Sequence, residues 1–199
     1  MGLDYSYEIF MPPRNVVRAL TQLAELAPQG RNTPSLRVTL PGGEQLIVPF
    51  TSNFKSEPVD CSAGGPLELD TSIVIGVDDA MRECFLRDSD TVDERGRVSV
   101  GYIYLTVRFS PAWHPNFASL QFTAATSSMS RMFVQSASVR KVFTDLTATT
   151  GGTCCLLDTE TDIFDLCWLN GETFSGETVP GARFSRFHDL VAAWREPVE

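Results

Sequence analysis

Cysteine and histidine are the side chains that most often serve as nucleophiles, general bases or metal ligands. The chain of 199 residues has two histidines and five cysteines, namely Cys61, Cys84, Cys154, Cys155 and Cys167. The cysteine count is odd and the spacing matches no metal-ligand pattern. We therefore predict that the cysteines are mainly buried small apolar side chains, and we expect neither a metal nor a cofactor.

Two of these cysteines come together if residues 153–169 form a hairpin around a polar turn. A register that pairs Asp158 with Ile163 places Cys154 directly opposite Cys167. A cross-strand disulfide is then one alternative, and a thiol site is the other. Buried small apolar side chains remain the simpler interpretation of both residues.

Acidic side chains also accumulate on this hairpin. Asp158 with Asp165, or Glu160 with Asp162, form pairs of the type that performs general acid–base catalysis. Carboxylates around a turn are more often solvated, and cysteines inside a sheet lack the helix terminus that activates a thiol. An enzyme with a cysteine or carboxylate site on the 153–169 hairpin is therefore an alternative hypothesis, while the sequence favours a non-enzymatic protein.

The two histidines form no recognisable catalytic arrangement. His114 lies in the segment Ala-Trp-His-Pro-Asn, which predicts a tight loop, and we expect it to support the turn or face solvent. His188 is expected at the surface of a terminal helix. No phosphate-binding loop, dinucleotide glycine fingerprint, nucleophile elbow or zinc-protease helix motif is present. The sequence therefore assigns no catalytic residue.

The best candidate for a working surface is the polar face of two predicted strands, 99–109 and 117–125. A register with Ser110 opposite Phe117 makes every pair on one face apolar: Val107 with Leu120, Leu105 with Phe122, and Ile103 with Ala124. A slip of one residue would mix polar and apolar side chains, so the separation itself supports this register. The opposite face then presents the candidate binding residues Tyr102, Tyr104, Thr106, Arg108 and Gln121.

These candidate residues are typical of a contact surface. Tyrosine supplies rigid area and a hydroxyl group, Arg108 supplies a planar set of donors, and Gln121 adds neutral hydrogen-bonding groups. A solvated or helix-covered sheet face would have the same composition, and that interpretation stays open. Our leading hypothesis is a non-enzymatic module that binds a small molecule or a protein partner. An acidic interaction or inhibitor protein that acts on a basic partner is a further alternative.

Composition and charge argue against several broad classes. The chain has 25 acidic and 16 basic residues, and the formal net charge of -9 disfavours non-specific binding to nucleic acid or anionic membranes. No apolar stretch approaches membrane-spanning length, and the first thirty residues lack a signal-peptide pattern, so we expect a cytoplasmic protein. The excess of 14 Arg over 2 Lys suggests a GC-rich bacterial genome.

The predicted elements indicate a single α+β domain over residues 1–199, which is long enough for one substantial core. Helices are expected where apolar residues recur every three or four positions, and strands where they alternate. The expected strands are 5–11, 35–40, 45–50, 67–77, 99–109, 117–125, 153–158 and 163–169. The expected helices are 16–27, a short one from Asp78 or Asp79 to Arg87, a pair over 129–150 that breaks near 136–138, and a terminal one over 183–195. Residues 51–66 and 173–182 are expected to be loops.

Two main helices and a short C-terminal helix are expected on one mostly antiparallel sheet of about eight strands. The first strand, helix and hairpin form a βαββ unit, and the same order recurs later, which makes halves 1–77 and 98–172 a candidate pseudo-repeat. In element order, over about half of the chain, such tandem units resemble the GyrI-like small-molecule-binding domains and the TATA-binding-protein fold. The resemblance includes no motif residue, and the acidic net charge argues against the DNA binding that the second fold implies.

Overall fold

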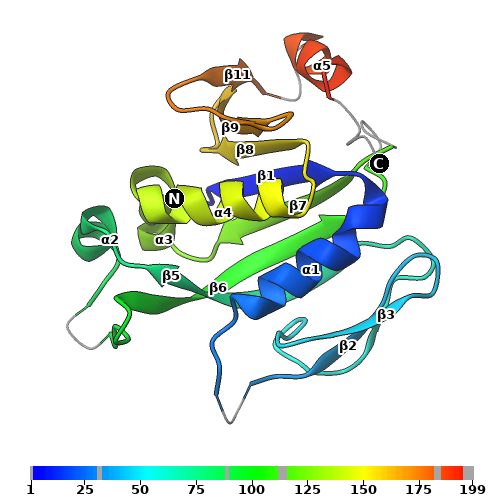
Figure 1. Ribbon diagram of the computed structural model, residues 1–199, viewed down its shortest axis with the longest axis horizontal. Coiled ribbons are helices and arrows are strands. Elements are labelled where there is room, and N and C mark those ends of the chain that lie inside the picture. The colour runs from blue at the N-terminus through cyan, green and yellow to red at the C-terminus, as the bar shows by residue number, and fades with distance from the viewer. Residues whose placement is uncertain (1, 31–32, 88–89, 112–115, 182–184, 195–199) are drawn as a thin grey trace.

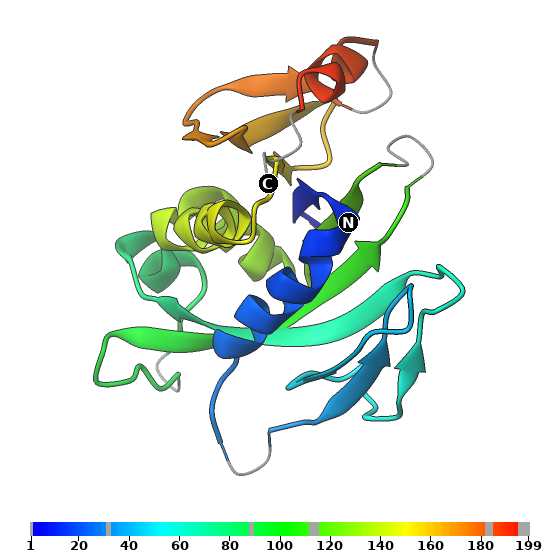
Figure 2. The same cartoon turned by 45° about the vertical axis from the view of Figure 1, so that its right-hand side comes forward.

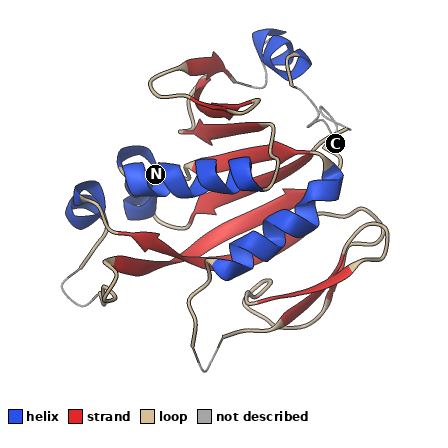
Figure 3. Ribbon diagram, in the orientation of Figure 1, coloured by secondary structure: helices blue, strands red, loops and turns tan. Residues whose placement is uncertain are grey.

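The computed structural model describes residues 2–30, 33–87, 90–111, 116–181 and 185–194. Within these ranges a large sheet, a small sheet and five α-helices form an α+β fold, as the sequence predicts (Figure 1, Figure 3). The large sheet contains β1 (Ser6–Met11), β5 (Leu67–Gly76), β6 (Arg97–Arg108), β7 (Ala118–Ala124), β8 (Cys154–Asp158), β9 (Ile163–Leu169), β10 (Glu172–Thr173) and β11 (Thr178–Pro180). The small sheet contains β2 (Leu36–Thr39), β3 (Gln45–Val48) and β4 (Val59–Asp60). The helices are α1 (Val16–Glu25), α2 (Asp79–Cys84), α3 (Ser127–Gln135), α4 (Ala137–Thr149) and α5 (Ser185–Ala192), and a 3-10 turn, η1 (Pro13–Asn15), precedes α1.

Strand β1 lies at the centre of the large sheet. The strands follow the order β10-β9-β8-β1-β7-β6-β5 with antiparallel pairing, and β11 also pairs with β9. Because side chains alternate along a strand, Tyr7, Ile9 and Met11 of β1 point to one face, and Glu8 and Phe10 point to the other. The prediction of one mostly antiparallel sheet of about eight strands is confirmed.

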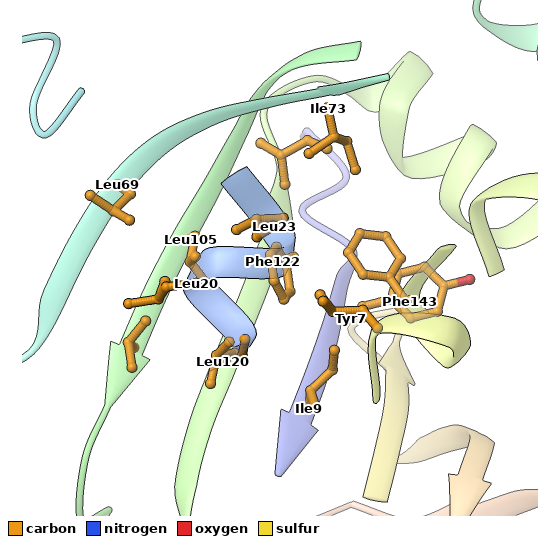
Figure 4. Close-up of a cluster of buried hydrophobic side chains, with 14 of the residues drawn as sticks. Tyr7, Ile9, Leu20, Leu23, Leu69, Ile73, Leu105, Leu120, Phe122 and Phe143 are labelled. Carbon is orange, nitrogen blue, oxygen red and sulfur yellow. The ribbon is translucent and has the colours of Figure 1, made fainter. Parts of the chain in front are cut away.

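Helices α1, α3 and α4 cover one face of the large sheet and enclose the main core (Figure 1, Figure 2). The apolar stripe that predicts α1 buries Leu20 and Leu23 in this core (Figure 4). Tyr7 stacks on Phe143 of α4 with ring centroids 4.3 Å apart, and its hydroxyl donates to the Phe133 carbonyl oxygen at 2.8 Å. Full burial of a large apolar side chain contributes about 1.5–3 kcal/mol, so these contacts fix the helices on the sheet.

The small sheet packs into the same core from the side of α1 (Figure 1). The predicted hairpin over residues 35–50 forms as β2 and β3, but its further partner is β4, so it does not join the large sheet. The inner face of the small sheet contributes the buried side chains of Leu36, Val38 and Val48 to the main core.

The proposed pseudo-repeat of halves 1–77 and 98–172 stays a prediction.

One carboxylate links α2 to the break between α3 and α4, which falls at Ser136 as predicted. Asp78 accepts hydrogen bonds from the Met81 amide at 2.9 Å, the Ser138 amide at 2.9 Å and the Ser136 hydroxyl at 2.7 Å. The Ser136 hydroxyl in turn accepts from the Val139 amide at 3.1 Å. Asp78 therefore caps the N-termini of both α2 and α4. Burial raises the pKa of Asp78, but these hydrogen bonds lower it more, so the pKa lies below its usual value.

The C-terminal segment corrects one prediction and confirms another. Residues 173–182 do not form only a loop, because β11 and the end of β10 pair along the outer edge of β9. Without a further strand, the outer edge of β9 would expose unpaired backbone N–H and C=O groups. The two short strands pair with these groups. The predicted terminal helix is α5, which forms a second apolar cluster on the face opposite to α4, with Phe10, Leu156, Phe187 and Trp194.

Candidate functional site

The predicted register of the two central strands is confirmed. In β6 and β7, Ile103 pairs with Ala124, Leu105 with Phe122, and Val107 with Leu120. Leu105 is 1% exposed, whereas its neighbour Tyr104 is 40% exposed. The five predicted candidate residues therefore lie together on the face of the sheet that points away from α1 and α4. We call this surface, formed by Tyr102, Tyr104, Thr106, Arg108 and Gln121, the polar sheet face.

Hydrogen bonds join three strands at one end of the polar sheet face. Arg108 Nη1 donates to Gln121 Oε1 at 3.0 Å, and Gln121 Nε2 donates to Ser6 Oγ at 3.4 Å. Thr106 is the cross-strand neighbour of Gln121. These bonds connect β6, β7 and β1, and they hold the Arg108 guanidinium over the sheet with donors that remain available to a ligand.

Aromatic rings form the other end of the polar sheet face. Phe54, from the segment between β3 and β4, is 63% exposed, and Tyr102 is 57% exposed. The Phe54 ring contacts Tyr102 at a centroid distance of 5.6 Å and Tyr104 at 6.4 Å, with interplanar angles of 74° and 85°. Edge-to-face contacts of this kind contribute about 0.5–1.5 kcal/mol each. We call these three rings the aromatic end.

A tight turn over Ser52–Lys55 holds Phe54 in this position. The two end residues exchange backbone hydrogen bonds of 2.9 and 3.0 Å, and the central residues Asn53 and Phe54 have φ angles of 50° and 58°. Left-handed backbone costs a bulky residue of the order of 1–3 kcal/mol. The Asp70 carboxylate offsets this cost, because its Oδ2 accepts from the Phe54 amide at 2.6 Å and from Thr51 Oγ1 at 3.0 Å.

An open groove of about 650 Å³ borders the aromatic end. It lies along the outer edge of β5, which is tied to neighbouring segments at two points. The Asp70 amide donates to the Thr51 carbonyl oxygen, and the Val74 amide donates to the Leu26 carbonyl oxygen, both at 2.8 Å. Between these points, Ser72 lines the groove. The groove volume falls within the range of small-molecule sites.

Three aromatic residues and one carboxylate line this groove. Phe54, Tyr102 and Asp70 line it together with Phe50 and three prolines, so its walls combine apolar surface with one negative charge. Sequence reasoning predicted Tyr102 but missed Phe54, which lies in the segment expected to be a long loop. The local signal for the turn is Asn53, a residue type that tolerates left-handed backbone.

A bulge in β6 lies next to the groove. The register with β5 shifts between Thr71 and Ser72, so Ser72 pairs with Gly101 and Tyr102 is the extra residue. Gly101 is needed for this close approach, because a Cβ atom there would overlap Ser72 Oγ and lie 3.2 Å from Ser72 Cβ. Bulges bend a strand and redirect a side chain, here that of Tyr102.

A largely buried carboxyl group, Glu8, lies on the same side of the large sheet. Glu8 is the β1 neighbour of Gln121. Burial raises the pKa of Glu8 to about 7, against the smaller lowering effects of the Ser119 hydroxyl and Arg108, and Asp158 raises it slightly. Alternation along β1 places Glu8 on this face, but no sequence pattern indicates a carboxyl group that titrates near neutral pH.

The β8–β9 hairpin does not place Cys154 opposite Cys167, which corrects the predicted register. Cys154 pairs with Leu169, and a bulge between Cys155 and Leu156 shifts the pairing. Cys155 and Cys167 point together into the main core, whereas Cys154 belongs to the cluster with α5. Burial raises the pKa of Cys154 and of Cys155 well above the usual value, and all five cysteines of the chain are free thiols. The Cys154 and Cys155 thiols are therefore protonated at neutral pH and inaccessible to a substrate, whereas Cys167 beside Cys155 is also buried but has a lowered pKa.

The other chemistry-bearing residues are also dispersed. Asp158 pairs with Phe164 and Asp165 with Leu157, so the two carboxylates point to opposite faces of the sheet. His188 is exposed on α5, and His114 lies outside the described residues. Within the described ranges, no group of three or more His, Cys, Asp or Glu side chains is arranged to hold a metal ion.

Comparisons of the chain with protein-family models, with curated proteins and with solved structures found no match. In the part of the chain that the structure describes, no helix is long and apolar enough to cross a membrane. The function is therefore inferred from the geometry and chemistry of the polar sheet face and its groove.

Proposed function

We propose that the protein is a non-enzymatic module that binds a small molecule at the aromatic end of the polar sheet face. The observation that carries the proposal is the contact of the exposed Phe54 ring with the exposed rings of Tyr102 and Tyr104 at the border of a groove. Clustered apolar surface on a protein exterior marks an interaction site, and the groove volume favours a small molecule over a protein partner.

The strained turn at Phe54 also supports a binding role for the aromatic end. A left-handed backbone at phenylalanine has a free-energy cost, and the Asp70 hydrogen bonds maintain it although Phe54 contributes little to the core. Such a residue is better explained by a role in binding than by a role in folding. At the other end of the face, Arg108 lies four residues from Tyr104 along β6, about 13 Å away. A longer ligand would reach both ends.

The enzyme hypothesis for the 153–169 hairpin gains no observation in its favour, because the thiols are buried and the Asp158 and Asp165 carboxylates are separated by the sheet. A cytoplasmic location, as expected from the sequence, forms part of the binding proposal.

A thermal-shift screen with small metabolites tests the proposal. A ligand present at a hundred times its Kd stabilises the native state by about 2.7 kcal/mol, which raises the Tm of a chain of this size by about 5–10 °C. The double variant Phe54→Ala with Tyr102→Ala is expected to lose this rise, because both side chains that contact the ligand are removed. Its Tm without ligand should fall by only several degrees, because both rings are more than half exposed and the variant loses little beyond the two edge-to-face contacts.

The matched control is Ile47→Ala with Ile163→Ala, which removes two exposed apolar side chains from other strands. It should retain the full ligand-induced rise. Equal rises in the wild-type protein and in the Phe54/Tyr102 double variant for every stabilising ligand would refute the proposal.

A further inference from the structure

We infer that the groove binds a small organic cation with a methylated ammonium group. This inference rests on the proposed function and names the ligand class of the same site. It follows from three described groups that line the groove, namely the rings of Phe54 and Tyr102 and the carboxylate of Asp70.

The two rings form adjacent walls of the groove. Their planes meet at 74° and their centroids lie 5.6 Å apart. The face of an aromatic ring carries partial negative charge and attracts a cation that lies within about 6 Å of the ring centroid. Two rings at a wide angle present two such faces to one bound group, the arrangement that recognises quaternary ammonium ions. Tyr104, at 85° to Phe54, packs against it and holds it in place.

Asp70 supplies the countercharge. Its Oδ2 accepts the hydrogen bonds from the Phe54 amide and from Thr51, which leaves Oδ1 for a ligand. Of the described residues that line the groove, Asp70 is the only one with a charge. Arg108 lies six residues from Tyr102 along β6, about 20 Å away, so its positive charge does not oppose a cation in the groove.

The lining favours a methylated ammonium over other cations. A divalent metal ion requires several oxygen ligands, whereas the described lining offers one carboxylate. A primary ammonium group is compact and strongly hydrated. Of the polar side chains in the lining, Gln29, Thr33 and Thr51 already donate hydrogen bonds within the chain, so the groove replaces few hydrogen bonds of such a group. Methyl groups on the nitrogen instead contact the apolar walls while the positive charge faces the rings and Asp70.

The test is a titration of the full chain with choline, with tetramethylammonium, and with the neutral isostere of choline in which carbon replaces the nitrogen. Amide chemical shifts report binding and its location. We expect both cations to shift the resonances of Phe54, Asp70 and Tyr102, and the isostere to bind at least about tenfold more weakly.

Four variants assign the effect to these residues. Tyr102→Leu and Phe54→Leu keep apolar bulk but remove a ring, and each should weaken choline binding roughly threefold to thirtyfold. Asp70→Asn keeps an acceptor oxygen for the turn but removes the charge, and it should weaken choline binding about tenfold without affecting the isostere. Glu68→Gln removes a carboxylate from the same face of β5 outside the groove lining, and it should change the affinity less than about twofold.

The remaining outcomes separate the two proposals. Equal binding of choline and its isostere would overturn recognition of the charge while leaving a ligand site in place. Choline binding that survives both Asp70→Asn and Tyr102→Leu would overturn the assigned location. If neither cation binds, the cation inference fails, and the thermal-shift screen, which includes neutral ligands, decides the proposed function independently.

Discussion

Two residues beside the polar sheet face are held in states that cost free energy. Phe54 adopts a left-handed backbone, and Glu8 is a largely buried carboxyl group whose pKa is about 7. Neither state improves packing in the main core. Strained backbone and perturbed titratable groups concentrate at functional sites, so both residues agree with a binding role for this side of the sheet.

The raised pKa of Glu8 predicts a specific dependence of stability on pH. In the unfolded chain the carboxyl loses its proton near pH 4.5, whereas in the native state it keeps the proton up to about pH 7. Between these values the native state binds more protons, so the free energy of unfolding falls as pH rises through this window, by about 3 kcal/mol in total. Above pH 7 this contribution is constant.

Denaturant unfolding of the wild-type protein and of Glu8→Gln between pH 5 and pH 8 checks this prediction. Glu8→Gln should lack the decline and should be up to about 3 kcal/mol more stable than the wild-type protein at pH 8. Glu68→Gln, which alters an exposed carboxylate on the same face, should follow the wild-type curve. Parallel curves for Glu8→Gln and the wild-type protein would show that Glu8 has an ordinary pKa.

At the scale of elements, the accuracy of the sequence prediction depends on whether the two faces of a strand differ. In β6, Tyr104 is polar and exposed and Leu105 is apolar and buried, so alternation specifies one register and the prediction is confirmed. In β8, Cys154 and Cys155 are both buried because a core covers each face of the strand. The alternation of polar and apolar residues therefore does not specify the register of β8 and β9. No local sequence pattern marks the bulge in this hairpin.

Other elements were missed because distant contacts define them. Strands β10 and β11 are two and three residues long and have no apolar pattern of their own. They are strands only because they pair with the edge of β9. The turn at Phe54 depends on Asp70, sixteen residues away in sequence. Strand alternation therefore predicted Tyr102, Tyr104 and the polar residues of the polar sheet face, but it could not predict Phe54 or the groove.

The shared cap at Asp78 gives a prediction for the helices. Asp78→Ala removes acceptors from the first turns of α2 and α4 together, so it should lower the free energy of unfolding by about 1–3 kcal/mol. Because hydrogen bonds hold the pKa of Asp78 below its usual value, this contribution is present at neutral pH and is lost as the pH falls below about 4. Urea unfolding at pH 7 measures the difference.

Asp79→Ala is the matched control, since it removes the neighbouring carboxylate, which makes no such cap, and it should cost less than about 1 kcal/mol. Equal losses for the two variants would indicate that general helix electrostatics, and not the shared cap, explain the effect.

For the molecule as a whole, the two faces of the large sheet have different roles. Helices α1, α3 and α4 cover one face and enclose one core. On the other face, α5 lies beside β9 and β11 at one end of the sheet and joins the second apolar cluster (Figure 2). The side chains of Tyr102, Tyr104 and Arg108 on that second face remain exposed. The fold class follows from the sequence, whereas the separation of β2 and β3 into a second sheet depends on packing against α1.

A crystal structure of the protein with the ligand that gives the largest rise of Tm in the screen locates the binding site. A second, smaller groove of about 310 Å³ lies between α1 and α4, lined by Gln22, Val142 and Leu146 among others. We expect ligand density against the rings of Phe54 and Tyr102, next to Asp70. Density in the groove between α1 and α4, with the aromatic end empty, would contradict the proposed binding site.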